Sequence, residues 1–414
     1  MSTVLVYTSP ARGHLFPVMD IALALKARGH RVALRTLSTE LELVARAGLE
    51  ARAISPDIEA RPIDDWQAKS PLASVKLAMA TFVERAAMEV DDLRRAIAEE
   101  RPDLLLVDTN CWGAHAVAEA SGIPWAVWHP FPMPLPSKDA PPFGPGLAPA
   151  RGPLGRLRDA LLQPLVIGPL QKVVPALNVV RKKAGATAFG HITEMYRRPP
   201  VLLHLTAEPF EYARRDWPKN IHHVGPGLWS PPATAPAWLA QCNKPLVLVT
   251  CSTEYQDDGA LVQAALDAFG TDDSVQLVCT TAGVDPKLFA PPPGVILERF
   301  VPHALLLPKA CAVVCHGGMG ITQRTLSMGV PACVVPWGRD QLEVGRRVEV
   351  AKAGTMLPRG KLSGPRLRAA VALARERVEG AKRIQVAFAQ AGGAERSARL
   401  LEGLLGTNGH RSAA

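Results

Sequence analysis

Short apolar strands alternate with helix-patterned segments in the first half of the chain, and this alternation constrains the fold more than any other feature. A helix around Val18 to Leu25 ends at Gly29, which is typical of a C-cap. Because most of the strands are apolar without interruption, they favour a parallel sheet that helices cover on both faces. Strands are predicted at residues 3–7, 31–36, 51–54, 104–108, 125–129 and 201–205, and further helices near residues 39–47, 71–99, 112–121 and 154–184.

A Pro- and Gly-rich segment, residues 225–236, predicts a linker, after which the same alternation begins again. Residues from 363 onward are predicted to be helical. The pattern therefore predicts an α/β fold with two doubly wound domains, and a length of 414 residues agrees, since about 150 residues per domain gives two to three domains. The strands of the second half are predicted at residues 246–250, 275–280, 295–298, 312–315 and 332–335.

The formal net charge of +9, from 47 basic and 38 acidic residues, makes an anionic partner worth testing. The basic residues form short groups between apolar runs, such as Arg181-Lys-Lys183 and Arg346-Arg347, and we interpret these groups as solvated helix faces. A nucleic-acid groove requires clustered basic residues with stacking aromatics. We therefore expect no nucleic-acid partner, whereas a small phosphorylated ligand suits the charge equally well.

The N-terminus and the cysteines favour a cytoplasmic protein. Residues 1–8 lack the charged region of a signal peptide, and no uncharged apolar run approaches the ~18 residues that a membrane span requires. The seven cysteines include no C-x-x-C pair, and most lie in apolar runs, which favours buried thiols over disulfides or a metal site. We expect no membrane span and no metal ion.

The ends of the predicted strands indicate where a site lies. If each half has the strand order 3-2-1-4-5, its first and fourth strands are neighbours, and a ligand crevice forms at their carboxyl ends. In the first half these ends carry His14, at a helix start, and Asp108. A helix N-terminus disfavours the charged imidazolium, and a carboxylate on the second ring nitrogen would fix the tautomer. The pair predicts an oriented general base, although His14 alone is more often a capping or packing residue.

In the second half, the corresponding strand ends carry Ser252 and Thr253, and the segment His316-Gly-Gly-Met-Gly-Ile-Thr322. Glycines directly before a helix let backbone N–H groups approach an anion, and the helix dipole adds attraction. The glycine pattern alone is weak, because such segments also form tight turns. The hydroxyls across the crevice favour a pyrophosphate as the ligand.

Asp340 and Gln341 follow another predicted strand into a helix, beside this glycine segment. They are compatible with an ordinary helix N-terminus. However, an acid and an amide side by side offer acceptors and donors to adjacent hydroxyls, so they also suit a polyhydroxylated ligand.

Together these segments resemble the family 1 glycosyltransferases, especially the actinobacterial enzymes that glycosylate macrolides and other natural products. They occur in family order over residues 3–400, so the resemblance covers nearly the whole chain. It implies the GT-B fold, in which two doubly wound Rossmann-like domains face each other across a cleft. The resemblance rests on Gly13-His14-Leu-Phe-Pro17, Arg299-Phe-Val-Pro-His303, His316-Gly-Gly-Met-Gly320, Gly329-Val-Pro331, Pro336-Trp-Gly-Arg-Asp-Gln341 and Gly392-Gly393.

The resemblance implies an inverting, metal-independent transfer of a sugar from a UDP- or dTDP-sugar to a hydroxyl of a small hydrophobic natural product, such as a macrolide, a polyketide or a phenol. His14 would be the general base and Asp108 its partner. The nucleotide sugar is a co-substrate, no other cofactor is implied, and the protein would be a monomer or a homodimer.

The resemblance also divides the chain. Residues 1–224 would bind the acceptor, residues 225–237 would link the domains, residues 238–384 would bind the donor, and the terminal helix, about 385–414, would rejoin the first domain. In the donor site, His316, Gly318 and Gly320 would hold the diphosphate, Val301 the nucleobase, and Asp340 with Gln341 the sugar. The full implied donor set is Gly13, Ser252, Thr253, Thr280, Phe300, Val301, His316, Gly318, Gly320, Ile321, Thr322, Trp337, Asp340 and Gln341.

Three residues depart from the family pattern. Ile321 stands where Ser or Thr is common, so that contact is left to the backbone or shifts to Thr322. Arg324 occupies the position of a ribose-binding Glu in plant members, which leaves the choice between UDP and dTDP open. Val344 replaces a frequent Asn, which leaves the sugar open.

The acceptor pocket is expected on the face of the first domain near His14. The Pro-rich segment 130–150 is incompatible with a strand or a helix interior and is predicted to be a long loop that binds ligand. Apolar side chains near His14 would bury an apolar acceptor, although Met79 and Phe82 equally suit a core. The candidates are Phe16, Trp66, Met79, Phe82, Trp112, Phe131 and Met133.

Two alternatives remain open at this point. The departures at Ile321, Arg324 and Val344 are compatible with an inactive homologue that binds a nucleotide or assists another transferase, whereas the intact pairs His14–Asp108 and Asp340–Gln341 argue against it. A nicotinamide-dependent oxidoreductase is disfavoured because the turn after the first strand lacks G-x-G-x-x-G.

Overall fold

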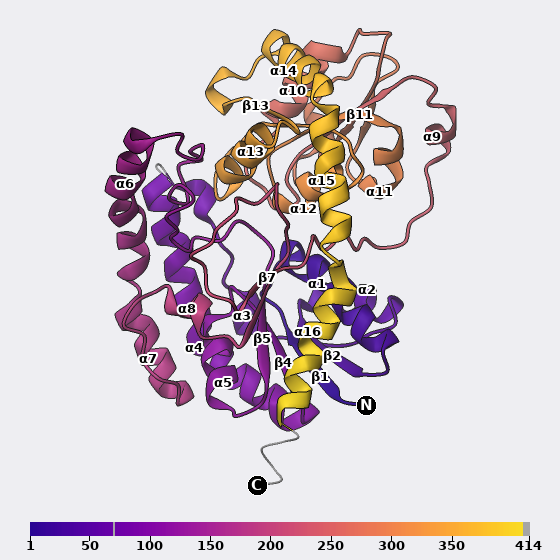
Figure 1. The fold of residues 1–414 in the computed structure, drawn as a ribbon. Helices are drawn as coiled ribbons and strands as arrows, with labels where there is room; N and C mark the ends of the chain where they lie inside the picture. Colours follow the sequence, from indigo (N-terminus) through magenta and orange to yellow (C-terminus); the bar gives the residue numbers. More distant parts are fainter. Residues whose placement is uncertain (69–70, 409–414) are drawn as a thin grey trace.

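The computed structural model describes residues 1–68 and 71–408 (Figure 1). Within these residues the strands form two fully parallel sheets, one of seven strands and one of six. The first sheet has the order β3-β2-β1-β4-β5-β6-β7, built from β1 (Thr3–Tyr7), β2 (Arg31–Thr36), β3 (Glu50–Ala53), β4 (Leu104–Asp108), β5 (Trp125–His129), β6 (Val201–His204) and β7 (Ile221–His223).

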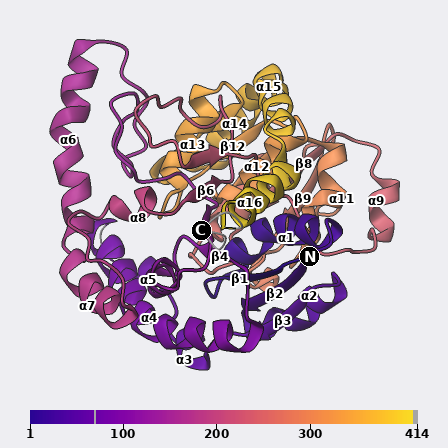
Figure 2. The same cartoon turned by 60° about the horizontal axis from the view of Figure 1, so that its bottom comes forward.

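Helices cover both faces of this sheet (Figure 2). They are α1 (Arg12–Ala27), α2 (Leu41–Arg46), α3 (Pro56–Glu59), α4 (Pro71–Glu100), α5 (Trp112–Ala120), α6 (Pro153–Gln171), α7 (Val174–Ala184) and α8 (Glu194–Arg197), with short 3-10 turns at Ser38–Glu40 and Asp65–Gln67.

The second sheet has the order β10-β9-β8-β11-β12-β13, so the predicted strand order and the prediction of two doubly wound α/β halves are confirmed. Its strands are β8 (Leu246–Thr250), β9 (Gln276–Thr280), β10 (Ile296–Glu298), β11 (Ala310–Cys315), β12 (Ala332–Val334) and β13 (Gly354–Met356). The helices are α9 (Ala237–Gln241), α10 (Ala260–Phe269), α11 (His303–Leu306), α12 (Met319–Ser327), α13 (Gln341–Val350), α14 (Gly364–Glu376), α15 (Val378–Gln390) and α16 (Gly393–Asn408), with 3-10 turns at Pro286–Leu288, Leu307–Lys309 and Arg359–Lys361.

Each sheet separates two hydrophobic clusters because successive side chains of a strand point to opposite faces. In β1, Leu5 and Tyr7 pack on the side of α4 and α5, whereas Val4 and Val6 pack on the side of α1. All four side chains are at most 1% exposed. The alternation of apolar strands and amphipathic helices in the sequence is thus the physical cause of the layered fold.

The last helix packs on the first half of the chain. Figure 1 shows the C-terminal chain in yellow, running from the second half down across the first, where α16 lies against α1. Ala398 and Leu401 of α16 are fully buried in the same cluster as Val4, and Arg28 after α1 forms an ion pair with Glu402.

The structure refines the sequence prediction at a few elements. The predicted helix over 154–184 is two helices, α6 and α7, which are bent by 46° relative to each other. The strands β7 (Ile-His-His) and β13 (Gly-Thr-Met) were missed because neither contains an apolar run, whereas β10 and β12, which are equally short, were predicted. Residues 130–150, all described, contain no helix or strand, as predicted.

Two further properties of the described residues bear on the predictions. No described helix is by itself long and apolar enough to cross a membrane, and α6 with α7 meets that criterion only as a bent pair. All seven cysteines are free, and all except Cys311, which is half-buried, are buried.

Candidate active site

The predicted pair His14–Asp108 is in contact at the carboxyl edge of the first sheet. His14 lies in the first turn of α1, directly after β1, and Asp108 ends the neighbouring strand β4. Nδ1 of His14 is 2.9 Å from Oδ1 of Asp108. The backbone N–H and the hydroxyl of Ser9 donate to Oδ2 at 3.1 and 2.9 Å, and the backbone N–H of Asn110 donates to Oδ1 at 2.9 Å. The orientation of the Asp108 carboxylate is thus fixed on both oxygens.

The electrostatics of this pair suit a base. Burial lowers the pKa of His14, but the charge and hydrogen bond of Asp108 outweigh it, so that the pKa lies above its usual value. Burial raises the pKa of Asp108, yet His14 and the surrounding hydrogen bonds bring it below its usual value. Asp108 is fully buried and His14 is 15% exposed. The neutral ring, with its proton on Nδ1, keeps Nε2 as the proton acceptor.

Two other side chains lie next to the imidazole ring of His14. The amide nitrogen of Asn110 lies 3.2 Å from Nε2, and the ring of Phe131 stands edge-on to the imidazole at 5.8 Å. Phe131 belongs to the start of the Pro-rich loop, so the structure brings this acceptor candidate to the predicted base. The contact of Asn110 was not predicted, although its place two residues after Asp108 was a usable signal.

In the second half, the glycine segment joins β11 to α12. Gly317 has φ +96°, and a Cβ there would lie 2.7 Å from Val334, so only glycine fits this turn. Gly318 is the N-cap of α12 and supplies no side-chain cap, and a Cβ on Gly320 would meet nothing within 4 Å. Burial lowers the pKa of His316 to about 4, so its ring is neutral. This helix N-terminus is free of side-chain capping, as an anion site requires.

The polar side chains near the glycine segment are engaged to different degrees. The backbone N–H of Ser252 donates to Asp258 at 2.6 Å, and its hydroxyl accepts a hydrogen bond from Gln256 at 2.9 Å. Thr253 is exposed. The hydroxyl of Thr322 is buried and donates to the carbonyl of Gly318 at 2.9 Å, so it is used within its own helix.

Asp340 and Gln341 are held differently. Gln341 is 2% exposed; its side-chain oxygen accepts from the backbone N–H groups of Trp337 and Gly338, and its amide nitrogen donates to Gln256 at 2.6 Å. Asp340 is the N-cap residue of α13 but makes no capping hydrogen bond with its side chain. Burial raises the pKa of Asp340, and this carboxylate in turn contributes to the raised pKa of His14. The charges of Asp340 and His14 therefore influence each other's pKa across the two halves.

Arg339 joins the two halves beside these residues. It has φ +52° and pairs with Asp65 of the first half, with Nη2 2.8 Å from Oδ1, and with Glu254 of the second half. Burial lowers the pKa of Arg339, but the two carboxylates outweigh it and raise it above its usual value. Sequence reasoning missed this bridge, since no pattern links positions so far apart.

The remaining donor candidates are mixed. Thr280 is buried with its hydroxyl 3.2 Å from Nε2 of His303, and Val301 is buried in the core of the second half. Phe300 is 58% exposed. Trp337 donates from Nε1 to the carbonyl of Asp257 at 3.1 Å. Gly13 lies exposed in the first turn of α1.

The acceptor candidates fall into separate groups. Phe82 and Trp112 pack with ring centroids 5.2 Å apart in the core cluster of the first half, against which Met79 also packs. Phe16 stands edge-on to Trp229 of the linker at 5.3 Å. The side chain of Trp66 lies outside the described residues.

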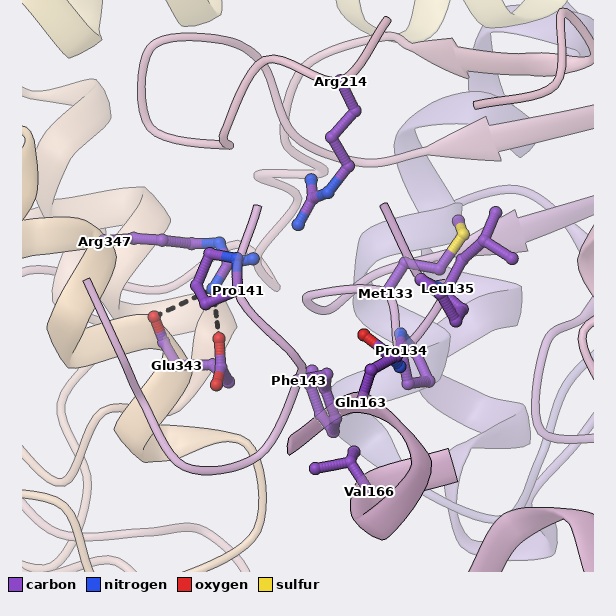
Figure 3. Close-up of a pocket in the computed structure, with 11 residues that line it drawn as sticks. Met133, Pro134, Leu135, Pro141, Phe143, Gln163, Val166, Arg214, Glu343 and Arg347 are labelled. Carbon is purple, nitrogen blue, oxygen red and sulfur yellow. Dashed lines mark hydrogen bonds and ion pairs between the residues drawn. The ribbon is translucent and has the colours of Figure 1, made fainter. Parts of the chain in front are cut away.

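Met133 is 1% exposed and lines a narrow pocket between the Pro-rich loop, α6 and α13, together with Phe143 and Arg347 (Figure 3).

All three departures make structural contacts. Arg324 donates to the carbonyl of Trp229, in the predicted linker, at 2.8 Å and so connects this segment to α12. Val344 is fully buried in the core of the second half. Ile321 packs against the same core. Among the described residues, no three His, Cys, Asp or Glu side chains are grouped as a metal site requires.

Comparisons with known proteins decide the family. Residues 263–390 match the family described as erythromycin biosynthesis protein CIII-like, C-terminal domain. Over 382 residues the chain is 32% identical to 4'-demethylrebeccamycin synthase of Lentzea aerocolonigenes, which covers 89% of this chain and 90% of that protein. The chain belongs to the family 1 glycosyltransferases. It is therefore a glycosyltransferase and not an oxidoreductase.

Other relatives agree with this family. The glycosyltransferase is 24% identical to demethyllactenocin mycarosyltransferase of Streptomyces fradiae, over 98% of this chain and 87% of that protein. Its structure matches that of the glycosyltransferase VinC in complex with dTDP with a TM-score of 0.71 and 19% identity, covering 98% of this chain and 100% of the other. The fold is GT-B, as the sequence resemblance implied.

Proposed function

We propose that this glycosyltransferase moves a sugar, with inversion and without a metal ion, from a UDP- or dTDP-sugar to a hydroxyl of a small hydrophobic natural product. The observation that carries this proposal is the 2.9 Å contact between Nδ1 of His14 and Oδ1 of Asp108 at the carboxyl edge of the first sheet. The natural-product enzymes among the relatives and the dTDP bound to VinC support the substrate classes.

In this mechanism, Nε2 of His14 accepts the proton of the acceptor hydroxyl. The oxygen forms a bond to the anomeric carbon as the bond from that carbon to the β-phosphate oxygen breaks, and the nucleoside diphosphate leaves with the electron pair. A single displacement from the opposite face inverts the anomeric configuration. Asp108 stabilises the imidazolium that forms.

The donor is proposed to lie against α12. The uncapped N–H groups that follow Gly318 are available to donate to the β-phosphate, and the helix dipole would favour the negative charge that develops as the diphosphate leaves. Asp340, whose side chain does not cap α13, accepts hydrogen bonds from the sugar hydroxyls. We assign residues 1–224 to the acceptor domain and residues 238–384 to the donor domain.

One substitution tests this function. His14→Ala removes the base, so we expect transfer to be lost while the binding of the nucleotide is retained. Wild-type and variant protein are mixed with UDP- and dTDP-sugars and a panel of phenols and macrolides, and products are identified by mass spectrometry and the anomeric configuration by NMR.

Nucleotide binding is measured separately, as the rise in melting temperature with UDP, dTDP or GDP. Undiminished turnover by the His14→Ala variant would contradict the mechanism. A product that retains the donor's anomeric configuration would contradict the single displacement.

A further inference from the structure

The helix that follows Asp340 is in close contact with the Pro-rich loop of the other half. Gly146 of this loop has φ +61°, and a Cβ there would lie 2.8 Å from the carbonyl oxygen of Leu342 in α13. The loop therefore approaches the helix so closely that only glycine fits at position 146.

A buried carboxylate on α13 holds the loop in place. Oε1 of Glu343 accepts hydrogen bonds from the backbone N–H groups of Gly144 at 2.8 Å and Gly146 at 2.9 Å. Nε of Arg346 donates to the carbonyl of Gly146 at 2.7 Å. Glu343 is 2% exposed, so its two loop contacts are screened from water and are strong.

The second oxygen of Glu343 is also used. It accepts from Nη1 of Arg347 at 2.8 Å, and Nη2 of Arg347 donates to Glu211 of the first half at 2.8 Å (Figure 3 shows Arg347, Glu343 and Arg214 around the pocket). Nη1 of Arg214 donates to the same oxygen of Glu211, Oε1, at 2.7 Å. Two carboxylates and two guanidinium groups thus neutralise each other at the interface between the two halves. Buried charges require such pairing.

We propose that Glu343 is a positioning residue that couples the Pro-rich loop to the donor-site helix. When a donor sugar binds at Asp340 and fixes the start of α13, the loop is fixed with it and the acceptor side of the cleft is formed. This inference rests on the proposed function, which assigns Asp340 to the donor and the loop to the acceptor. In this coupling, donor binding orders the loop, and an ordered loop in turn strengthens donor binding.

The variant Glu343→Gln keeps the shape of the side chain but breaks this arrangement. An amide has one oxygen, so its NH2 group faces either the guanidinium of Arg347 or the N–H groups of the loop. A second variant, Gly146→Ala, pushes the loop off α13 from the other side and leaves every charge intact. Glu376→Gln, at an exposed position on α14, is the control.

Hydrogen–deuterium exchange of the full-length protein with and without dTDP-glucose measures the coupling. In the wild type and the control, the donor slows exchange at residues 317–323 and also slows exchange at residues 143–147 by about fivefold or more, the lower end of usual coupling factors. In both test variants the slowing at 317–323 remains and the slowing at 143–147 is lost. A purely structural role of Glu343 would not change this donor-dependent difference.

Steady-state kinetics give a second measurement. Both test variants raise the acceptor KM by about fivefold or more and leave kcat within about twofold, because the loop is displaced but the base is intact. The proposal is overturned if the loop does not respond to the donor in the wild type, or if folded variants keep the response. Lack of protection at 317–323 with both dTDP-glucose and UDP-glucose would instead refute the donor site itself. If Glu343→Gln does not fold, Gly146→Ala decides.

Discussion

Replacing Asp108 with Asn tests the orientation of the base most directly, because it changes one oxygen into an NH2 group at constant shape. Oδ1 accepts from His14 and from the N–H of Asn110, and Oδ2 accepts from both donors of Ser9. An NH2 group at either place therefore opposes a donor. If it replaces Oδ1, His14 must carry its proton on Nε2, the atom that has to accept the proton of the acceptor hydroxyl.

We expect kcat/KM of the Asp108→Asn variant to fall by about 10²–10⁴-fold, the usual contribution of general base catalysis. The pH profile gives a second signature. The neutral ring of His14 is the base, so the rate rises with pH through its pKa, which Asp108 holds above the usual value. Without the carboxylate charge this pKa is lower, so the rising limb moves to lower pH while the plateau falls.

The assay is kcat/KM for the acceptor between pH 5 and 9, with nucleotide binding measured in parallel by thermal shift. Asp103→Asn is the matched control, because this acid accepts a hydrogen bond from the backbone N–H of Thr3 at 2.8 Å but lies at the opposite end of β4. The variants His14→Ala and His14→Ala/Asp108→Asn should be equally slow, since Asp108 acts through His14. An Asp108→Asn enzyme with the rate and pH profile of the wild type would refute the reasoning.

Two further predictions concern stability. Glu211→Gln leaves the fully buried guanidinium of Arg347 without its main partner and should lower the free energy of unfolding in urea by about 3–5 kcal/mol. The pKa of Glu211 lies well below its usual value despite burial, so the stabilisation from this pair is present at neutral pH and is lost as the pH falls through the folded-state pKa. The variant should therefore lack this loss of stability in acid. A variant whose free energy of unfolding falls with decreasing pH as steeply as that of the wild type would contradict this. Gly113→Ala places a Cβ 1.9 Å from the carbonyl oxygen of Ala86 and should lower the free energy of unfolding by about 1–3 kcal/mol or more, because α5 is displaced from α4. The control Gly403→Ala, whose added Cβ would meet nothing within 4 Å, should not destabilise the protein. Equal melting temperatures of the two variants would refute the close approach of α5 to α4.

The fold was predictable from the sequence because its causes are local. Most of the longer strands contain a continuous apolar run, with β3 (Glu-Ala-Arg-Ala) as an exception. The doubly wound topology then places the carboxyl ends of β1 and β4 side by side, and this placement predicted the contact of His14 with Asp108. What the sequence did not indicate were the three-residue strands β7 and β13 and the break between α6 and α7. These depend on tertiary packing and not on a repeating pattern.

The charges explain why the rest of the site escaped prediction. The interpretation of the basic groups as solvated helix faces is wrong for Arg347, which is 1% exposed, and for Arg181, which is 1% exposed beside Glu119. A local pattern cannot distinguish an arginine that faces water from one whose carboxylate partner lies 136 residues away, as Glu211 does from Arg347. The same holds for Arg339, which pairs with Asp65 over 274 residues.

These long-range pairs lie at the interface between the two halves, next to the proposed donor and acceptor sites. A net charge of +9 therefore says little about the anion that the protein binds, because several cations next to the site are neutralised by its own carboxylates. The proposed diphosphate site is the uncapped N-terminus of α12, whose partial charge comes from the backbone dipole and is absent from any count of charged side chains. The ion pairs at the interface thus connect the two halves, and the backbone of α12 is the proposed binding site for the diphosphate of the donor.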